Sequence, residues 1–278
     1  MAISQRFRPQ FFNIDPFAPL ARGLVFAGLG CAPGTFFYKD SSRESKGNDG
    51  TLTGYANDGG ADSPTKQWQF IPELGRWALG FDGSDDYVGF TTYPRWFPIG
   101  TTPMSAMAWV NPTTAAGAHV IWGFGKGTYY KSFGAYVTND NSLYVWLWGT
   151  GDYDTGVNLV GGAWTHVAVV HFGGVVTTYV NGVSIDSRAK ALNVIAGFGI
   201  GADTIDPGAT SFWKGLLADV NVWSRALSVA EIRQLADPSN VMLSGLIKSV
   251  VRKTYFIPPV GGIVIPVMMH HYKMMRSA

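Results

Sequence analysis

The residues from about Gly23 to Leu227 form short apolar or alternating runs, each ended by turn-forming residues. This spacing is typical of a β-sandwich, because strands there are short and joined by tight turns. The 35 glycines and 15 prolines suit such turns, and Asn181-Gly182 predicts a type I′ hairpin. We therefore expect an all-β fold. The predicted strands are residues 23–28, 77–82, 87–91, 104–110, 119–123, 133–138, 142–148, 164–172, 175–181, 184–187, 197–201 and 213–223.

One short helix is predicted after the last of these strands. Ser228 and Glu231 have the spacing of a capping box, in which each residue's side chain bonds the other's backbone N–H. Apolar residues at helical spacing follow. Asp237-Pro238 then ends the helix, because the residue before a proline disfavours the helical conformation.

The two ends of the chain differ from its middle. We divide the chain into an N-terminal arm (residues 1–20), a domain (residues 21–240) and an extended apolar C-terminal arm (residues 241–278). Pro266 interrupts the apolar run of the C-terminal arm, which disfavours a central strand. The arm either folds back on its own domain or packs on a neighbouring subunit, since exposed apolar segments mark interaction sites. The residues predicted to contact a partner are Ile263, Val264, Ile265, Val267, Met268 and Met269.

Charge and cysteine content narrow the classes of function. The net charge of +2 and the scattered lysines and arginines argue against a nucleic-acid partner. No run reaches the 18 to 20 apolar residues that span a bilayer. Cys31 is the only cysteine, which excludes an intrachain disulfide and a cysteine-based zinc site. The first residues lack the apolar core of a signal peptide, so we expect synthesis in the cytoplasm and a final place on a virion or other extracellular particle.

Four segments carry a family resemblance. They are Gly23-Leu24-Val25-Phe26 with the turn-rich stretch up to Gly54, Ala78-Leu79-Gly80-Phe81-Asp82-Gly83, Trp164-Thr165-His166-Val167-Ala168-Val169 up to Asn181-Gly182, and Gly215-Leu216-Leu217-Ala218-Asp219-Val220 up to Glu231. In this order they resemble laminin-G-like jelly-roll domains of the concanavalin A-like lectin/glucanase superfamily. The resemblance implies a two-sheet antiparallel jelly roll whose first and last strands pair, with the Ser228 helix closing one end. This fold hosts lectins, glycanases and structural modules alike.

The carboxylates needed for glycanase chemistry are not evident in the sequence. Glycosidases place two carboxylates on either side of the scissile bond. The chain has only three glutamates, of which Glu231 belongs to the predicted capping box. Asp152 and Asp154 alternate, but they lie in a predicted loop without a glutamate partner. His166 falls in a predicted buried strand, and no nucleophile elbow is present. We therefore expect that the protein is not an enzyme.

The resemblance also implies a structural calcium ion near the junction of the first and last strands. Calcium takes six to eight oxygen ligands, which loops rich in aspartate and asparagine supply. The matching positions are Asp40, Asn48 and Asp219, with Asp82 and Asp86 as a second group. The alternative is that these residues only form turns.

Aromatic residues offer candidate glycan contacts. Tyr144, Trp146 and Trp148 alternate along one predicted strand and therefore share a face, which is either a stacking platform for sugars or part of the core. Tyr153 lies in a predicted loop and is a further candidate.

Two functions remain. The first is a non-catalytic structural or decorating subunit of a large assembly, in particular a bacteriophage virion, which contacts itself or other subunits through the terminal arms and has possible glycan contact. The alternative is a carbohydrate-binding lectin module that acts alone or on a cell surface.

Overall fold

The computed structural model describes residues 18–29, 34–35, 37–42, 48–56, 61, 63–90, 93, 96–113, 117–125, 130–148, 151–203 and 209–239. They all lie within one compact unit, Met1–Lys248. The predicted partner contacts from Ile263 to Met269 therefore lie outside the described residues. Within the described ranges, no helix is long and apolar enough to cross a membrane.

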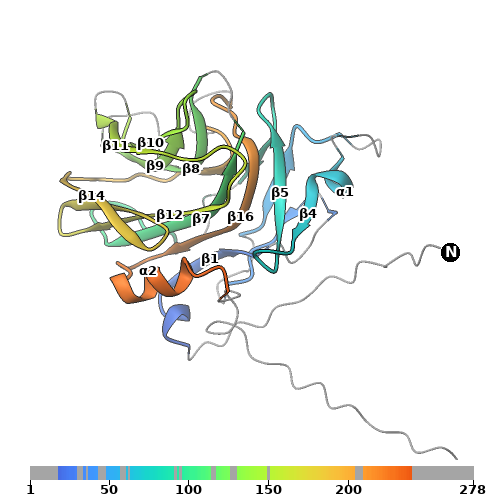
Figure 1. The fold of residues 1–278 in the computed structure, drawn as a ribbon. Helices are drawn as coiled ribbons and strands as arrows, with labels where there is room; N and C mark the ends of the chain where they lie inside the picture. The colour runs from blue at the N-terminus through green and yellow to red at the C-terminus, as the bar shows by residue number, and fades with distance from the viewer. Residues whose placement is uncertain are drawn as a thin grey trace, which may run out of the picture. The chain divides into compact units, whose positions relative to one another are not determined.

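Among the described residues, two antiparallel sheets form the fold (Figure 1), and three short helical segments accompany them. The back sheet contains β1 (Leu24–Gly28), β4 (Trp68–Ile71), β5 (Arg76–Asp82), β7 (Met104–Pro112), β12 (Thr165–Phe172), β13 (Val175–Val180), β14 (Val183–Ala189) and β16 (Lys214–Trp223). The front sheet contains β2 (Phe37–Tyr38), β3 (Gly50–Thr53), β6 (Tyr87–Gly89), β8 (His119–Gly125), β9 (Ser132–Val137), β10 (Ser142–Trp146), β11 (Tyr153–Asn158) and β15 (Phe198–Ile200). The helical segments are η1 (Pro19–Ala21), α1 (Pro64–Gln67) and α2 (Val229–Leu235).

The strand order confirms the predicted two-sheet jelly roll. The back sheet runs β14-β13-β12-β7-β16-β5-β4, and β1 also pairs with β16. The front sheet runs β11-β10-β9-β8-β15-β6-β3-β2. The first and last strands pair antiparallel, with Phe26 opposite Val222 and Gly28 opposite Val220, as the family resemblance implied.

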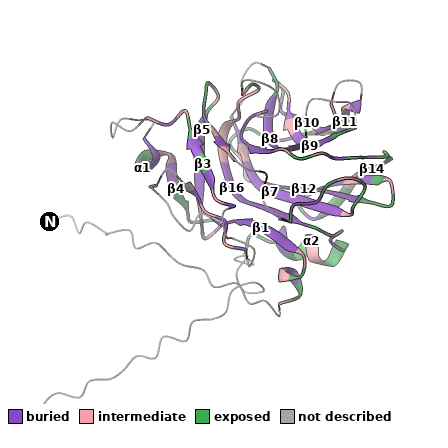
Figure 2. Cartoon of the chain, turned by 180° about the vertical axis from the view of Figure 1, so that it is seen from behind, coloured by how far each residue is buried: buried purple, intermediate pink, exposed green. Residues whose placement is uncertain are grey.

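The main hydrophobic core lies between the two sheets (Figure 2, purple). Alternate residues point inward from each strand, because successive side chains of a strand face opposite ways. In β7 these are Ala106, Ala108 and Val110, and in β10 they are Leu143 and Val145. Burial of this apolar surface is the main stabilising term of the sandwich.

A second apolar cluster covers part of the outward face of the back sheet. Leu20 of η1 and Ile232 and Leu235 of α2 pack there against Trp223 and Met107. The Trp223 indole Nε1 donates to the Leu20 carbonyl at 2.7 Å. The helix therefore lies over this outward face, where the resemblance had implied that it closes an end of the sandwich.

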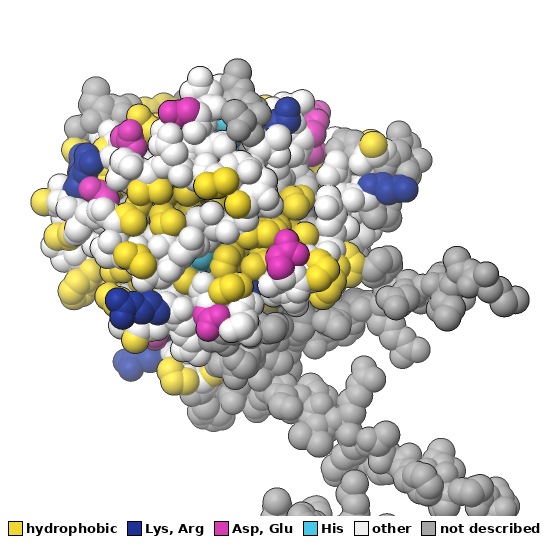
Figure 3. Space-filling model, in the orientation of Figure 1, with side chains coloured by type: hydrophobic (Ala, Val, Ile, Leu, Met, Phe, Trp, Pro, Cys, Tyr) yellow, Lys and Arg dark blue, Asp and Glu magenta, His cyan; other side chains and the backbone are white. Residues whose placement is uncertain are grey.

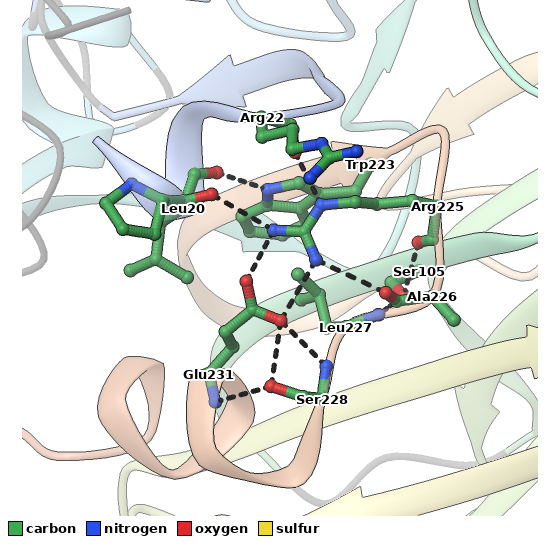
Figure 4. A network of polar contacts seen from close by, with 10 residues as sticks. Leu20, Arg22, Ser105, Trp223, Arg225, Ala226, Leu227, Ser228 and Glu231 are labelled. Carbon is green, nitrogen blue, oxygen red and sulfur yellow. Dashed lines mark hydrogen bonds and ion pairs between the residues drawn. The ribbon is translucent and has the colours of Figure 1, made fainter. Parts of the chain in front are cut away.

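Arg225 joins the N-terminal segment to α2 (Figure 4). Its guanidinium donates to the carbonyls of Pro19 and Arg22 and makes a paired contact with the Glu231 carboxylate, at 2.6 and 2.9 Å. Glu231 also accepts from the Ser228 backbone N–H at 2.8 Å, while the Ser228 hydroxyl accepts from the Glu231 N–H. This capping box confirms the predicted start of the helix.

A third, smaller apolar cluster lies on the same outward face, toward β5. Apart from the buried members of this cluster, Figure 3 shows hydrophobic side chains at the surface in the middle of the view, over β12, β7 and β16 of Figure 1. The members of the cluster are Ile71, Leu74, Ala78, Trp109 and Ala218, with Trp164 and Leu216 packed against them. The back sheet therefore buries apolar side chains on both of its faces.

Four strands were not expected from the sequence, namely β2, β3, β4 and β11. The sequence of β11, Tyr-Asp-Thr-Gly-Val-Asn, contains three residue types that are depleted in strands. It is extended because β10 offers it hydrogen bonds, with Tyr144 opposite Asp154. Conversely, β10 ends at Trp146 and not at Trp148, because Trp148 adopts a left-handed backbone conformation with φ of 76°.

Candidate functional site

The outward surface of the front sheet near its β11 edge carries four aromatic side chains. Tyr144 and Trp146 alternate with the core residues Leu143 and Val145, so they point away from the core. Tyr136 of β9 lies opposite Tyr144. We call Tyr136, Tyr144, Trp146 and Trp148 the aromatic face. The structure thus brings the three predicted stripe residues together and adds Tyr136, which alternation along β9 was able to reveal.

The four rings form two contacting pairs. Tyr136 and Tyr144 are stacked, with ring centroids 5.1 Å apart and an interplanar angle of 27°. The ring centroids of Trp146 and Trp148 lie 6.1 Å apart. Trp146 is buried, whereas the other three side chains are half-buried and keep part of each ring accessible. Partly exposed aromatic rings suit stacking against the apolar face of a sugar ring.

Trp146 lies against a row of glycines that crosses the front sheet. Gly134, Gly123, Gly199 and Gly89 are paired in register on neighbouring strands. A Cβ on Gly123 would stand 2.0 Å from the Trp146 ring, and one on Gly134 would stand 2.8 Å away. Glycine in a strand interior often marks a place where another group approaches the backbone closely. Here that group is the Trp146 indole.

Trp148 is held in an unusual backbone conformation. Its φ of 76° is costly for a bulky side chain. The Asp152 carboxylate stabilises the turn, because it accepts a hydrogen bond from the Leu147 N–H at 2.7 Å. Backbone strain of this kind concentrates at ligand-binding positions. The turn therefore fixes the Trp148 ring beside Trp146.

Two carboxylates border the aromatic face. Asp154 of β11 is exposed and lies directly opposite Tyr144, on the face away from the core. Burial raises the pKa of Tyr136, and Asp152, Tyr144 and Asp154 raise it further. Burial also raises the pKa of Asp152, against the hydrogen bonds from the backbone of the turn. The site therefore combines aromatic rings with hydrogen-bond acceptors.

Tyr153 is not part of this face, and its predicted position in a loop is wrong. It lies in β11 with its side chain in the core. The Arg188 guanidinium stands 4.2 Å from its ring centroid, and the Lys190 ammonium stands 5.2 Å away. Because neighbouring residues of a strand face opposite ways, Tyr153 points inward where Asp154 points outward. Its role is to join β11 to the β14 edge of the back sheet.

The predicted calcium ligands Asp40 and Asn48 meet, but as hydrogen-bond partners. Asp40 Oδ1 accepts from the backbone N–H groups of Ala27 and Ser42, at 2.9 and 2.8 Å. Asp40 Oδ2 accepts from the Ser42 hydroxyl and from the Asn48 side-chain amide, at 2.9 and 3.2 Å. Four hydrogen bonds use the four acceptor positions of a carboxylate. Asp40 therefore ties β1 to the following loop, and its oxygens do not fit a metal ligand.

The third predicted ligand, Asp219, is paired with a cation of the protein itself. Its carboxylate accepts from Arg76 Nη1, and both side chains are buried. Burial raises the pKa of Asp219, whereas Arg76 lowers it. A guanidinium thus already engages Asp219, and a calcium ion shared by Asp40, Asn48 and Asp219 stays a prediction that this arrangement does not favour.

The second predicted calcium group, Asp82 and Asp86, does come together, and Asp85 joins it without having been predicted. The three residues place a carboxyl oxygen each within 4.8 Å of one another. Asp86 also accepts from the Asp82 N–H at 3.0 Å, and Asp82 accepts from the Ser84 N–H at 2.7 Å. These bonds fit a turn between β5 and β6 equally well. Calcium at this turn stays a prediction.

His166 has the buried position in a strand that the sequence predicted. It lies fully buried in β12, with its ring centroid 5.4 Å from that of Trp109 and Nε2 3.3 Å from the Met107 sulfur. Burial and the nearby Arg76 lower its pKa to about 3, so it is neutral near pH 7. No nucleophilic hydroxyl is among its hydrogen-bond partners in the described part of the chain.

The family of the chain follows from a family model. The model described as the concanavalin A-like lectin/glucanases superfamily matches residues 82–233, which is more than half of the chain. The chain belongs to this superfamily. The match covers the aromatic face, the β12–β13 hairpin and the capping box of α2. No match was found among curated protein sequences.

Several solved structures share the fold at low sequence identity. Domain 4 of the GH43 extracellular arabinanase AbnA from Geobacillus stearothermophilus, solved in complex with arabinotriose, is 20% identical with a TM-score of 0.58 and covers 77% of this chain and 98% of its own. A Trypanosoma rangeli sialidase mutant with trans-sialidase activity is 14% identical with a TM-score of 0.58, covering 83% of this chain and 36% of its own. The binding domain of Paraclostridial Mosquitocidal Protein 1 is 13% identical with a TM-score of 0.58, covering 79% and 53%. The chain thus has a lectin-like fold and spans about a third of the sialidase.

Proposed function

We propose that the protein is a non-catalytic glycan-binding domain that stacks sugars on the aromatic face. The observation that carries this proposal is the group of three half-buried rings, Tyr136, Tyr144 and Trp148, beside Trp146 on one outward surface. Sugars present apolar ring faces and many hydroxyl groups, so aromatic rings and carboxylate acceptors complement them. The arabinanase domain with the same fold was solved with a bound oligosaccharide.

The carboxylates near this face support binding and not hydrolysis. Asp152 accepts hydrogen bonds from the backbone of the turn that precedes β11, and it therefore stabilises this turn. Asp154 is exposed to solvent and its Oδ1 accepts from the Gly156 N–H, which leaves it available to ligand hydroxyls. Glu231 belongs to the capping box of α2. The proposed domain therefore holds a glycan without cleaving it.

Affinity electrophoresis in gels that contain soluble polysaccharides tests this proposal. We expect at least one neutral polysaccharide to retard the full-length chain, and Tyr144→Ala and Trp148→Ala to reduce that retardation by about tenfold, since a lost stacking contact costs about 1–1.5 kcal/mol. Phe70→Ala is the matched control, because Phe70 is an exposed aromatic side chain of the back sheet. Equal retardation of all four proteins would refute the assignment of the site.

A second candidate function is that of a subunit of a larger assembly, including a virion. The observation that favours it is a set of exposed apolar side chains at two neighbouring places. Trp96 and Ile99 precede β7, while Phe172 ends β12 and Val175 begins β13. His171 Nδ1 lies 3.4 Å from the Thr102 carbonyl and links these two places. Exposed clusters that contain aromatic residues are typical of protein interfaces.

Light scattering separates this candidate from a free lectin. The solution mass of the full chain is compared with that of a chain ending at Asn240 and with that of a Trp96→Ser/Phe172→Ser variant. An assembly subunit gives a discrete oligomer that either change weakens. A monomeric mass for all three proteins would leave only the glycan-binding function.

A further inference from the structure

We infer that the aromatic face selects neutral, hydroxyl-rich glycans and discriminates against glycans that carry carboxylates. This inference rests on the proposed function and adds the chemical class of the ligand. Its basis is the distribution of charge around the four rings, because the anionic groups face the surface on which a sugar would stack while the nearby cations are engaged elsewhere.

Asp154 is the group to which a ligand hydroxyl would donate a hydrogen bond. It lies directly opposite Tyr144, and side chains in such cross-strand positions are about 5 Å apart at Cβ. Its Oδ1 accepts from the Gly156 N–H at 2.8 Å. Among the described residues no other donor reaches this carboxylate, so acceptor positions remain for sugar hydroxyls. A carboxylate that accepts from a hydroxyl makes a strong, charge-assisted bond.

Asp152 adds a second negative charge on the same side. It is half-buried beside Trp148, and its charge together with that of Asp154 reaches the Tyr136 hydroxyl. The Asp203 carboxylate is near enough to raise the pKa of Asp152 further, although burial is the larger cause. On the β11 side, the surroundings of the rings are therefore acidic.

Two cations near β11, Arg188 and Lys190, do not balance that charge on the outward side. Arg188 stacks on the inward-facing ring of Tyr153 and donates to the Asp154 backbone carbonyl at 2.8 Å. Lys190 stands over Tyr153 and Tyr130 and donates to the Gly151 carbonyl at 3.4 Å. Lys190 still lowers the pKa of Asp152, but less than burial and Asp203 raise it. Both cations hold the β11 and β14 edges together.

A glycan carboxylate placed on the rings would meet this acidic border. Two like charges at about 4 Å repel by roughly 1 kcal/mol in water, which is about fivefold in affinity, and the repulsion approaches or exceeds tenfold at a partly buried surface. A neutral sugar meets no such repulsion and offers donors to Asp154. The repulsion is screened as ionic strength rises.

Affinity electrophoresis with matched gels tests the inference on the full-length chain. The gels contain neutral arabinan, galactan or hydroxyethyl cellulose, or the acidic polygalacturonate or carboxymethyl cellulose. We expect retardation by a neutral polymer to exceed that by an acidic polymer about tenfold at low salt, and the difference to shrink in 0.5 M NaCl. Asp154→Asn and Asp154→Lys are expected to shift preference stepwise toward the acidic polymers. The control is Asp140→Asn, which changes an exposed carboxylate of the β9–β10 turn outside the aromatic face.

The outcomes separate the inference from the function on which it rests. Preference for neutral polymers that falls in the order wild type, Asp154→Asn, Asp154→Lys supports both. Retardation by acidic polymers equal to or above that by neutral ones, with loss in Tyr144→Ala, retains the glycan-binding face and overturns its selectivity. Retardation by none of the five polymers overturns the proposed function and the inference together.

Discussion

The outward faces of the two sheets are used in opposite ways. On the back sheet, η1 and α2 cover Trp223 and Met107, and the Arg225 network fastens both segments in place (Figure 4). On the front sheet, Tyr136, Tyr144 and Trp148 stay half-buried and border two carboxylates. Both faces carry aromatic residues at alternate strand positions. Among the described residues, η1 and α2 cover the back face, which stabilises the fold, whereas three rings of the front face stay partly accessible.

The largest expected effect on the free energy of unfolding is at the buried Arg76–Asp219 ion pair of the back sheet. Asp219→Asn leaves the Arg76 guanidinium without a counter-charge, and breaking a buried pair costs about 3–5 kcal/mol. We expect a loss of about 3 kcal/mol in the free energy of unfolding, measured by chemical denaturation. The control is Asp49→Asn at the more exposed Lys39–Asp49 pair, with a loss below about 1 kcal/mol. Equal losses would mean that burial of the pair is immaterial.

The next effect lies on the front face, between Gly123 and Trp146. Gly123→Ala places a Cβ where the indole lies, and overpacking of this kind costs about 1–3 kcal/mol. The cost is expected to disappear in a Trp146→Ala background, because the space is then empty. A double-mutant cycle of unfolding free energies measures this coupling. Additive losses would show that Trp146 does not rest on the glycine row.

A smaller effect comes from the Glu231 carboxylate that fastens α2. Hydrogen bonds from Arg225, followed by those from Ser228, lower its pKa to about 2, against an ordinary value of 4.5. A depressed pKa in the folded state contributes stability that is present above pH 4.5 and is lost as the pH falls toward 2. We expect Glu231→Gln to cost about 1 kcal/mol at pH 7 and almost nothing at pH 2. A loss that is the same at both pH values would contradict this assignment.

The smallest effect on stability is expected at Tyr144 itself. Tyr144→Ala removes one partner of the Tyr136–Tyr144 stack, which contributes about 0.5–1.5 kcal/mol. Because the ring is only half-buried, we expect about 0.5 kcal/mol in unfolding while glycan binding falls much more. A loss above 3 kcal/mol in the free energy of unfolding would mean that the aromatic face stabilises the fold as the back face does. The contrast between the two faces would then be wrong.

The sequence predicted most of the scaffold but only part of the site. Alternation identified β5, β7, β12, β13 and β16, and the Ser228–Glu231 spacing identified the start of α2. It missed β11, because glycine and aspartate obscure a strand whose conformation comes from pairing with β10. Tyr153 was misplaced for the same reason. The sequence showed that Tyr144, Trp146 and Trp148 share a face. It did not show how far that face is exposed, or that Tyr136 belongs to it.

The sequence by itself determined the all-β class, the order of the main strands and the common face of the stripe, because these depend on local periodicity and turn residues. The tertiary structure alone decided that Arg76, 143 residues from Asp219, occupies its carboxylate, and that Asp154 stands beside Tyr144. Such contacts depend on strand register and on which elements cover a face. Those are set by the packing of the whole sandwich, and no local pattern of residues encodes them.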